Sequence, residues 1–101
     1  MAKFVYLYTG GQMAETPEAQ EKEMQAWGAW LGGLGSSATD QGNPFGKSTA
    51  VTSRGVGGSS SNIGGYSIIT ADSLEDATTR ADGCPVLQSG GAVEVYEALE
   101  M

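Results

Sequence analysis

Residues 3–9, KFVYLYT, set the architecture of this chain, because they predict a strand that is covered on both faces. The five central residues are all apolar or aromatic, and strands favour aromatic and β-branched side chains. Since side chains alternate along a strand, Phe4, Tyr6 and Tyr8 share one face and the two aliphatic residues share the other. A strand without a polar face needs a layer of structure on each side.

The stretch TPEAQEKEMQAWGAWLGGLG, residues 16–35, gives the clearest helix signal. Thr16 suits the N-cap, and Pro17 suits the first helical position. Trp30 widens an apolar stripe that recurs at helical spacing, at Met24, Trp27, Leu31 and Leu34. The glycines at the end of the stretch weaken the last turn and end the helix there.

The rest of the chain predicts a second helix and further strands. The segment 47–53 is a weak strand and 65–71 is a good one, a capping box opens a helix over roughly 73–82, and 91–99 is the last strand. The order is βαββαβ, which predicts one α+β domain over residues 1–101. Its fold would be ferredoxin-like, a four-stranded antiparallel sheet with both helices on one face.

The sheet face without helices needs a cover of its own. We assign Phe4, Tyr6 and Tyr8 to that face, where three aromatic residues are too apolar to be left in water. The simplest cover is the same face of a second copy related by two-fold symmetry. The sequence therefore predicts a homodimer formed through the sheet.

Charge and hydropathy exclude several kinds of partner. Twelve acidic and five basic residues give a net charge of −7, which argues against nucleic acid and anionic membranes. No apolar run approaches the length of a membrane span, and the N-terminus lacks the features of a signal peptide. We expect a cytoplasmic protein.

The chain contains no histidine, and this absence excludes a Cys–His or Ser–His nucleophile pair even in a homodimer. With one cysteine a zinc site is not expected, so we predict neither a metal nor another cofactor. Cys84, between Gly83 and Pro85, has two interpretations. It is a reactive thiolate, for which no base is present, or a small buried residue, which we favour.

The glycine-rich segment 54–65 resembles a phosphate-binding loop only in composition. A phosphate loop opens a helix, whereas this segment leads into a strand and lacks the required spacing. We interpret it as a connector between antiparallel strands, in which Arg54 could still meet an anion.

The segment DQGNPFGK, residues 40–47, combines an acid, an amide and an ammonium group around a turn fixed by Pro44. One interpretation is a ligand rim made of Asp40, Asn43 and Lys47. The other, which we favour, is an Asx-type turn in which Asp40 or Asn43 bonds the backbone.

Aromatic residues elsewhere predict a cleft for a small molecule, between sheet and helix or inside the dimer. Trp27 and Trp30 with Met24 would line it on the first helix, although aromatics at helical spacing are more often core. Further candidates for its lining are Tyr6, Tyr66, Glu94 and Tyr96. Glu94 is either a buried carboxylate with a raised pKa, able to act as acid or base, or a rim residue paired with Lys or Arg across the dimer.

Four motifs in fixed order resemble the YCII-related (DGPF-domain) family over essentially the whole chain. They are GNPFG at 42–46, GYSIITADSLEDA at 65–77, GCPVL at 83–87 and GGAVEVYEALEM at 90–101. The resemblance implies a bacterial protein that forms a dimeric α+β barrel.

The resemblance carries little chemistry over to this chain. Some members of the family are described as enzymes with a His–Asp pair, and some relatives are encoded beside alternative sigma factors. Here the histidine is missing, and Cys84-Pro85 stands where many members have Asp-Pro. The family's Asp-Gly-Pro-Phe signature is replaced here by Gly-Asn-Pro-Phe at residues 42–45. A His–Asp mechanism is therefore not expected.

Two functions follow from the sequence. We favour a homodimeric small-molecule-binding or regulatory module without catalysis. The alternative is a small-molecule enzyme in which Glu94, Asp40 and tyrosines transfer protons.

Overall fold

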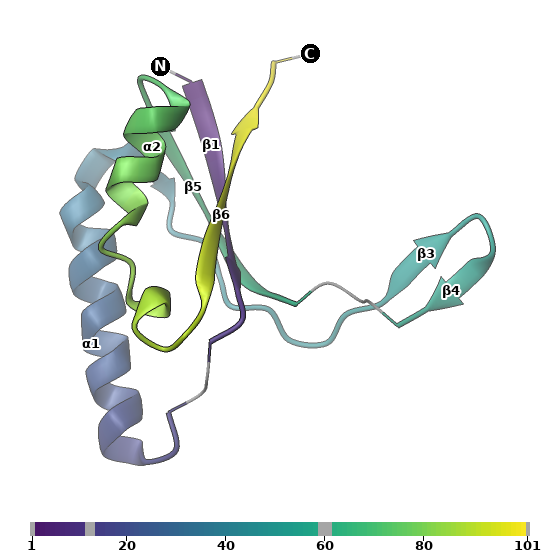
Figure 1. The fold of residues 1–101 in the computed structure, drawn as a ribbon, viewed down its shortest axis with the longest axis horizontal. Helices are drawn as coiled ribbons and strands as arrows, with labels where there is room; N and C mark the ends of the chain where they lie inside the picture. Colours follow the sequence, from purple (N-terminus) through teal and green to yellow (C-terminus); the bar gives the residue numbers. More distant parts are fainter. Residues whose placement is uncertain (1, 12–13, 59–61, 101) are drawn as a thin grey trace.

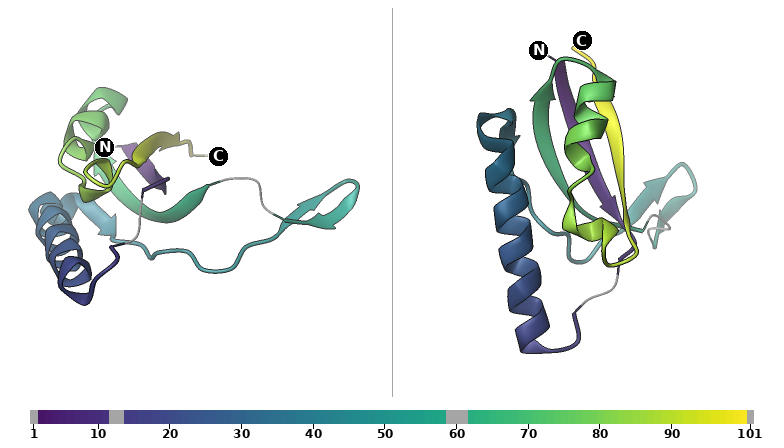
Figure 2. Two further views of the ribbon diagram at one scale, coloured as in Figure 1. Left: turned by 60° about the horizontal axis from the view of Figure 1, so that its bottom comes forward. Right: turned by 60° about the vertical axis from the view of Figure 1, so that its left-hand side comes forward.

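The structure, a computed structural model, describes residues 2–11, 14–58 and 62–100. Its main sheet has four antiparallel strands in the order β2-β5-β1-β6, and two helices cover one face (Figures 1 and 2). The strands of this sheet are β1 (Ala2–Thr9), β2 (Ala38–Asp40), β5 (Ile63–Ala71) and β6 (Ala92–Ala98). The helices are α1 (Pro17–Leu34) and α2 (Leu74–Ala81), with 3-10 turns at Gly35–Ser37 and Pro85–Leu87. This confirms the predicted ferredoxin-like α+β fold.

The local signals at both helix starts have the predicted effect. The Thr16 hydroxyl accepts a hydrogen bond from the backbone N–H of Ala19 at 3.1 Å, which caps α1. The Ser73 hydroxyl accepts one from the N–H of Asp76 at 3.0 Å and caps α2. No helix of the described residues is both long and apolar enough to span a membrane.

The prediction that the aromatic face of β1 is the uncovered face is wrong. Phe4, Tyr6 and Tyr8 are at most 8% exposed and lie beneath the helices. The tryptophans of α1 explain why this face is buried. Trp30 stacks on Tyr6, and Trp27 meets Tyr8 edge to face with 4.8 Å between the ring centroids. Alternation separates the two faces of a strand but cannot say which one the helices cover.

The opposite face of the sheet carries the aliphatic residues of β1, and we call it the open face. In the strand register Leu7 lies between Tyr66 and Glu94. In the next row Val5 lies between Ile68 and Tyr96. The apolar members of these rows are half-buried or exposed, so the open face is the one that the described residues leave without a cover.

The second strand of the sheet also differs from the prediction. Residues 38–40 form β2 beside β5, whereas the segment 47–53 contributes to a separate hairpin of β3 (Ala50–Thr52) and β4 (Gly55–Gly57). β2 is too short to show a period, so only its pairing with β5 reveals it.

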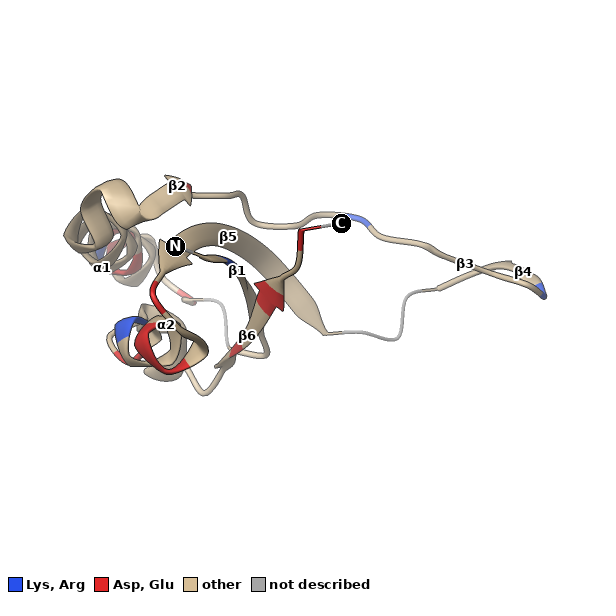
Figure 3. Ribbon diagram, turned by 90° about the horizontal axis from the view of Figure 1, so that it is seen from above, with Lys and Arg blue, Asp and Glu red and all other residues tan. Residues whose placement is uncertain are grey.

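We call residues 47–58 the arm. The arm stands away from the sheet, on the side opposite to the helices (Figures 1 and 3).

Candidate functional site

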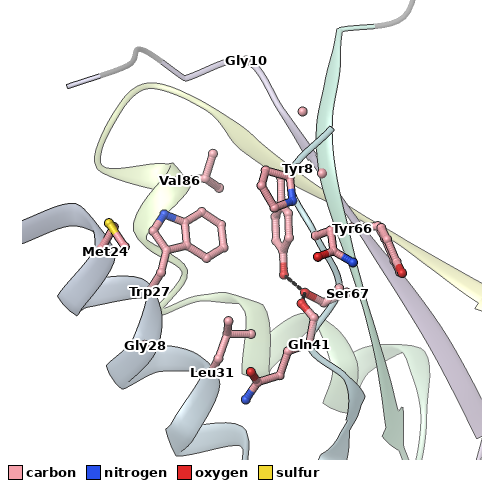
Figure 4. A pocket seen from close by; sticks show the side chains of 15 residues that line it. Tyr8, Gly10, Met24, Trp27, Gly28, Leu31, Gln41, Tyr66, Ser67 and Val86 are labelled. Atoms are coloured by element: carbon pink, nitrogen blue, oxygen red, sulfur yellow. Dashed lines mark hydrogen bonds between the residues drawn. The ribbon is translucent and has the colours of Figure 1, made fainter. Parts of the chain in front are cut away.

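A cavity of about 520 Å³ lies between α1 and the part of the sheet where β5 begins. One wall is a face of α1 with Met24, Trp27, Gly28 and Leu31 (Figure 4). The opposite wall consists of residues 41–44 and 64–65. We call this cavity the pocket.

Two hydroxyl groups of the pocket wall are joined in a chain of hydrogen bonds. The Tyr8 hydroxyl donates to Ser67 Oγ at 2.6 Å, and the Ser67 hydroxyl donates to the carbonyl of Gln41 at 2.7 Å (Figure 4). Burial raises the pKa of Tyr8 well above the ordinary value of a phenol, although the bond to Ser67 opposes this. Both hydroxyls are therefore neutral at physiological pH.

The turn that forms the far wall is fixed by Asp40. Its Oδ1 accepts a hydrogen bond from the N–H of Gly42 at 2.8 Å, as in an Asx turn. Its Oδ2 accepts a hydrogen bond from the Tyr66 hydroxyl at 3.3 Å. The structural interpretation of this segment is thus confirmed for Asp40. Lys47 lies exposed in the arm.

The structure brings only part of the predicted cleft together. Trp27, Asn43 and Tyr66 line the pocket with Met24, and the ring of Tyr66 points away from Trp27 and Tyr8 (Figure 4). Tyr6 and Trp30 are absent from its lining and pack in and against the core. The Tyr6 hydroxyl donates to the carbonyl of Ala77, and Trp30 Nε1 donates to that of Arg80 at 3.2 Å.

Glu94 and Tyr96 lie on the open face, across the sheet from the pocket. Both side chains are exposed in the single chain, and the Tyr96 hydroxyl donates to Glu94 Oε1 at 3.4 Å. The two alternatives for Glu94, a buried carboxylate or a residue paired across the dimer, both concern a second copy.

Sequence reasoning missed Tyr8, Leu31 and Ser67 as pocket residues. Ser67 had a signal, because in the strand 65–71 it is a hydroxyl on the same face as Ile69, which is buried. A polar group on a buried face needs a partner, and Tyr8 is that partner. Leu31 had a weaker signal as part of the apolar stripe of α1.

Cys84 lies in the core, as the packing interpretation predicted. It is 1% exposed, immediately before the 3-10 turn at Pro85–Leu87. Burial raises the pKa of the Cys84 thiol to about 11, while a hydrogen bond from the backbone of Val86 lowers it by less. The thiol is thus protonated and covered at neutral pH.

We expect Cys84 to react with a thiol reagent such as Ellman's reagent at least roughly a hundredfold more slowly in the native protein than in urea. The reagent needs an exposed thiolate, and the fold withholds both exposure and ionisation. The absorbance of the released thiolate, followed at neutral pH, measures both rates. Rapid stoichiometric labelling of the folded protein would contradict the core placement.

The glycine-rich segment 54–65 contains β4 and the first residues of β5, and it does not open a helix. The interpretation of the whole segment as a connector is therefore wrong for Gly55–Gly57, which pair with β3, and its three serines, 59–61, lie outside the described residues. Among the described residues, no group of three or more His, Cys, Asp or Glu is placed to hold a metal ion.

The fold and the pocket together define a ferredoxin-like α+β domain with a cavity of ligand size. The chain belongs to the YCII-related domain family, whose model matches residues 2–101.

A solved structure with the same fold is the 5-chloro-2-hydroxyhydroquinone dehydrochlorinase from Burkholderia phenoliruptrix, in complex with 2,5-dihydroxybenzoquinone. The two chains are 17% identical with a TM-score of 0.59, and the match covers 97% of this chain and 95% of that one. A search of curated proteins found no match.

Proposed function

We propose that this protein binds a small, planar, uncharged molecule in the pocket and acts as a binding or regulatory module. The observation that carries the proposal is the composition of the pocket. Its volume of about 520 Å³ lies in the usual range for ligand sites, and its walls are mainly aromatic and apolar. Among the described residues that line it, none carries a carboxylate, an ammonium or a guanidinium group.

The polar groups of the pocket support a ligand that carries hydroxyl or carbonyl oxygens on a ring. Ser67 Oγ and the side-chain amides of Gln41 and Asn43 can exchange hydrogen bonds with such oxygens. Trp27 and Tyr8, which meet edge to face, offer aromatic surface to the ring. The dihydroxybenzoquinone bound by the solved relative belongs to this broad chemical class.

Acid–base catalysis is the less favoured alternative. Both oxygens of Asp40 already accept hydrogen bonds, and Glu94 is on the opposite face of the sheet. Tyr8 is held neutral by burial. A pocket with this set of groups is suited to binding rather than to proton transfer near neutral pH.

We include a cytoplasmic homodimer in this proposal, formed through the open face. The half-buried Val5, Leu7 and Ile68 form an apolar strip there, and Tyr96 beside them is 53% exposed. Pairing two such faces around a two-fold axis would remove this strip from water. The cytoplasmic location rests on the expectation from sequence.

Filling the pocket tests the binding function directly. We expect Gly28→Leu to weaken binding of hydroquinone and 1,4-dihydroxynaphthalene at least about tenfold, measured by isothermal titration calorimetry. Gly28 lines the pocket, and a Cβ added there meets nothing within 4 Å, so the backbone accepts a side chain and we expect a leucine to fill part of the cavity. In the wild type, ionised 2,5-dihydroxybenzoquinone should bind more weakly than these uncharged rings, because none of the described residues that line the pocket is a Lys or an Arg.

The matched control is Gly33→Leu. Gly33 lies on the same helix, its added Cβ also meets nothing within 4 Å, and it does not line the pocket. Binding should be unchanged in this variant. Equal affinity in all three proteins, or no binding of any ring by the wild type, would refute the proposed function.

A further inference from the structure

The charges of the chain are unevenly distributed along the sequence. Residues 41–71 contain Lys47 and Arg54 and no acidic residue, so all twelve acidic residues lie elsewhere. Both basic residues belong to the arm: Lys47 is its first residue, and Arg54 lies in the turn between β3 and β4. Figure 3 shows basic residues in this element and no acidic ones. The arm is therefore a cationic element on a strongly anionic protein, which attracts it to an acidic surface.

The arm has little support from its own chain. Val51 and Val56 face each other across the hairpin, yet they are 77% and 74% exposed. A Cβ added at Gly57 or Gly58 would meet nothing within 4 Å. Among the described residues, β3 and β4 pack appreciably only against each other. Because an isolated two-stranded hairpin is marginally stable in water, the arm needs another surface.

The direction of the arm indicates on which side of the sheet its packing partner lies. The arm projects beyond the open face, away from α1 and α2 (Figures 2 and 3). The acidic residues of its own helices are thus on the wrong side. A second copy that covers the open face would lie beside the arm.

The second copy offers one edge of its sheet that is suitably charged. β6 is an edge strand, and no basic residue follows Arg80 in the sequence. Its glutamates lie on both sides of that edge: Glu94 pairs with Leu7 on the open face, Glu97 pairs with Phe4 on the helix-covered face, and Glu100 lies just beyond the strand. At the other edge the carboxylate of Asp40 already accepts two hydrogen bonds. When two open faces pair, Glu94 loses water and needs a counter-charge, and within the four described strands of the sheet Lys3 is the one basic residue.

We propose that the arm of each copy contacts a second copy and lies along the edge of its β6, where Lys47 and Arg54 meet the glutamates that flank this edge on its two faces. This inference rests on the proposed homodimer but does not depend on ligand binding. It assigns a function to the insertion between β2 and β5 that the βαββαβ fold does not require.

A charge exchange between two variants tests the proposal. One variant has an acidic arm, with Lys47→Glu and Arg54→Glu, and the other has a basic strand, with Glu94→Lys and Glu97→Lys. All four positions are exposed, so both variants should keep the far-ultraviolet circular dichroism of the wild type. Each alone should dimerise about tenfold or more weakly than the wild type by sedimentation equilibrium, because its arm and strand carry like charges.

Mixing the two variants should restore association, because in the heterodimer both arm–strand contacts join opposite charges. Native mass spectrometry separates the species by mass, and heterodimer should exceed the half expected from random pairing. Wild-type affinity in each separate variant, or random pairing in the mixture, would reject the role of the arm and leave the sheet dimer intact. A monomeric wild type would reject both, whereas ring binding is measured independently.

Discussion

Replacing Gly42 with alanine should lower the free energy of unfolding by about 3 kcal/mol or more. Gly42 has φ +78°, a backbone conformation that residues with a Cβ rarely adopt. A Cβ built there would lie 1.6 Å from the carbonyl oxygen of Tyr66 and 2.6 Å from its carbonyl carbon. The obstacle is backbone within β5, so no side-chain rotation relieves it.

To avoid this clash, the backbone at residue 42 must move away from β5, and this movement should also damage the pocket. Moving Gly42 breaks the hydrogen bond that its N–H donates to Asp40 and shifts the carbonyl of Gln41, which accepts from Ser67. The pocket wall formed by residues 41–44 is then displaced from the cavity. We expect Gly42→Ala to lose ring binding together with stability, the first measured by calorimetry and the second by urea unfolding.

Gly46→Ala is the matched control for this prediction. Gly46 belongs to the same connection, its φ is not positive, and a Cβ added there meets nothing within 4 Å. Its stability should stay within about 1 kcal/mol of the wild type. If the two alanine variants unfold at the same urea concentration, the close approach of Gly42 to β5 is not a feature of the folded protein.

The two helices and the strands β1, β5 and β6 were predictable from the sequence because they depend on local periodicity and capping. The capping residues Thr16 and Ser73 mark both helix starts, and β1 and β5 have strong strand signals. The second strand of the sheet was not predictable, since Ala38–Asp40 has no pattern and depends on β5 for its pairing. The segment around Val51 has strand-forming residues, but residue type does not reveal which strand it pairs with.

The site was predictable only in part, because a pocket is a property of the packed elements. The stripe of α1 pointed to Trp27 and Met24, yet nothing local shows that Trp27 meets Tyr8 rather than another aromatic ring. The wrong prediction for the faces of β1 has the same cause. Both faces of this strand are apolar, and the presence of aromatic residues on one of them does not reveal which face the helices cover.

Two neighbouring isoleucines of β5 test which face of the sheet the helices cover, because one lies on each face and their substitutions should differ strongly in their effect on stability. We expect Ile69→Ala to lower the free energy of unfolding by about 2–5 kcal/mol, the usual cost of deleting a fully buried aliphatic side chain. Ile69 is 0% exposed and pairs with Phe4 beneath the helices. Ile68→Ala should cost about 1 kcal/mol or less at protein concentrations where the chain is monomeric, because Ile68 is half-buried on the open face.

Sedimentation equilibrium should reverse this order. Ile68→Ala removes apolar surface from both copies of a two-fold interface, so its effect on dimer affinity counts twice, whereas Ile69 does not reach that interface. The dimer is linked to stability by mass action, and urea unfolding of Ile68→Ala should therefore approach that of the wild type as the protein is diluted. An equal loss of monomer stability in the two variants would mean that both faces of β5 are covered within one chain. The open face would then have no need of a second copy.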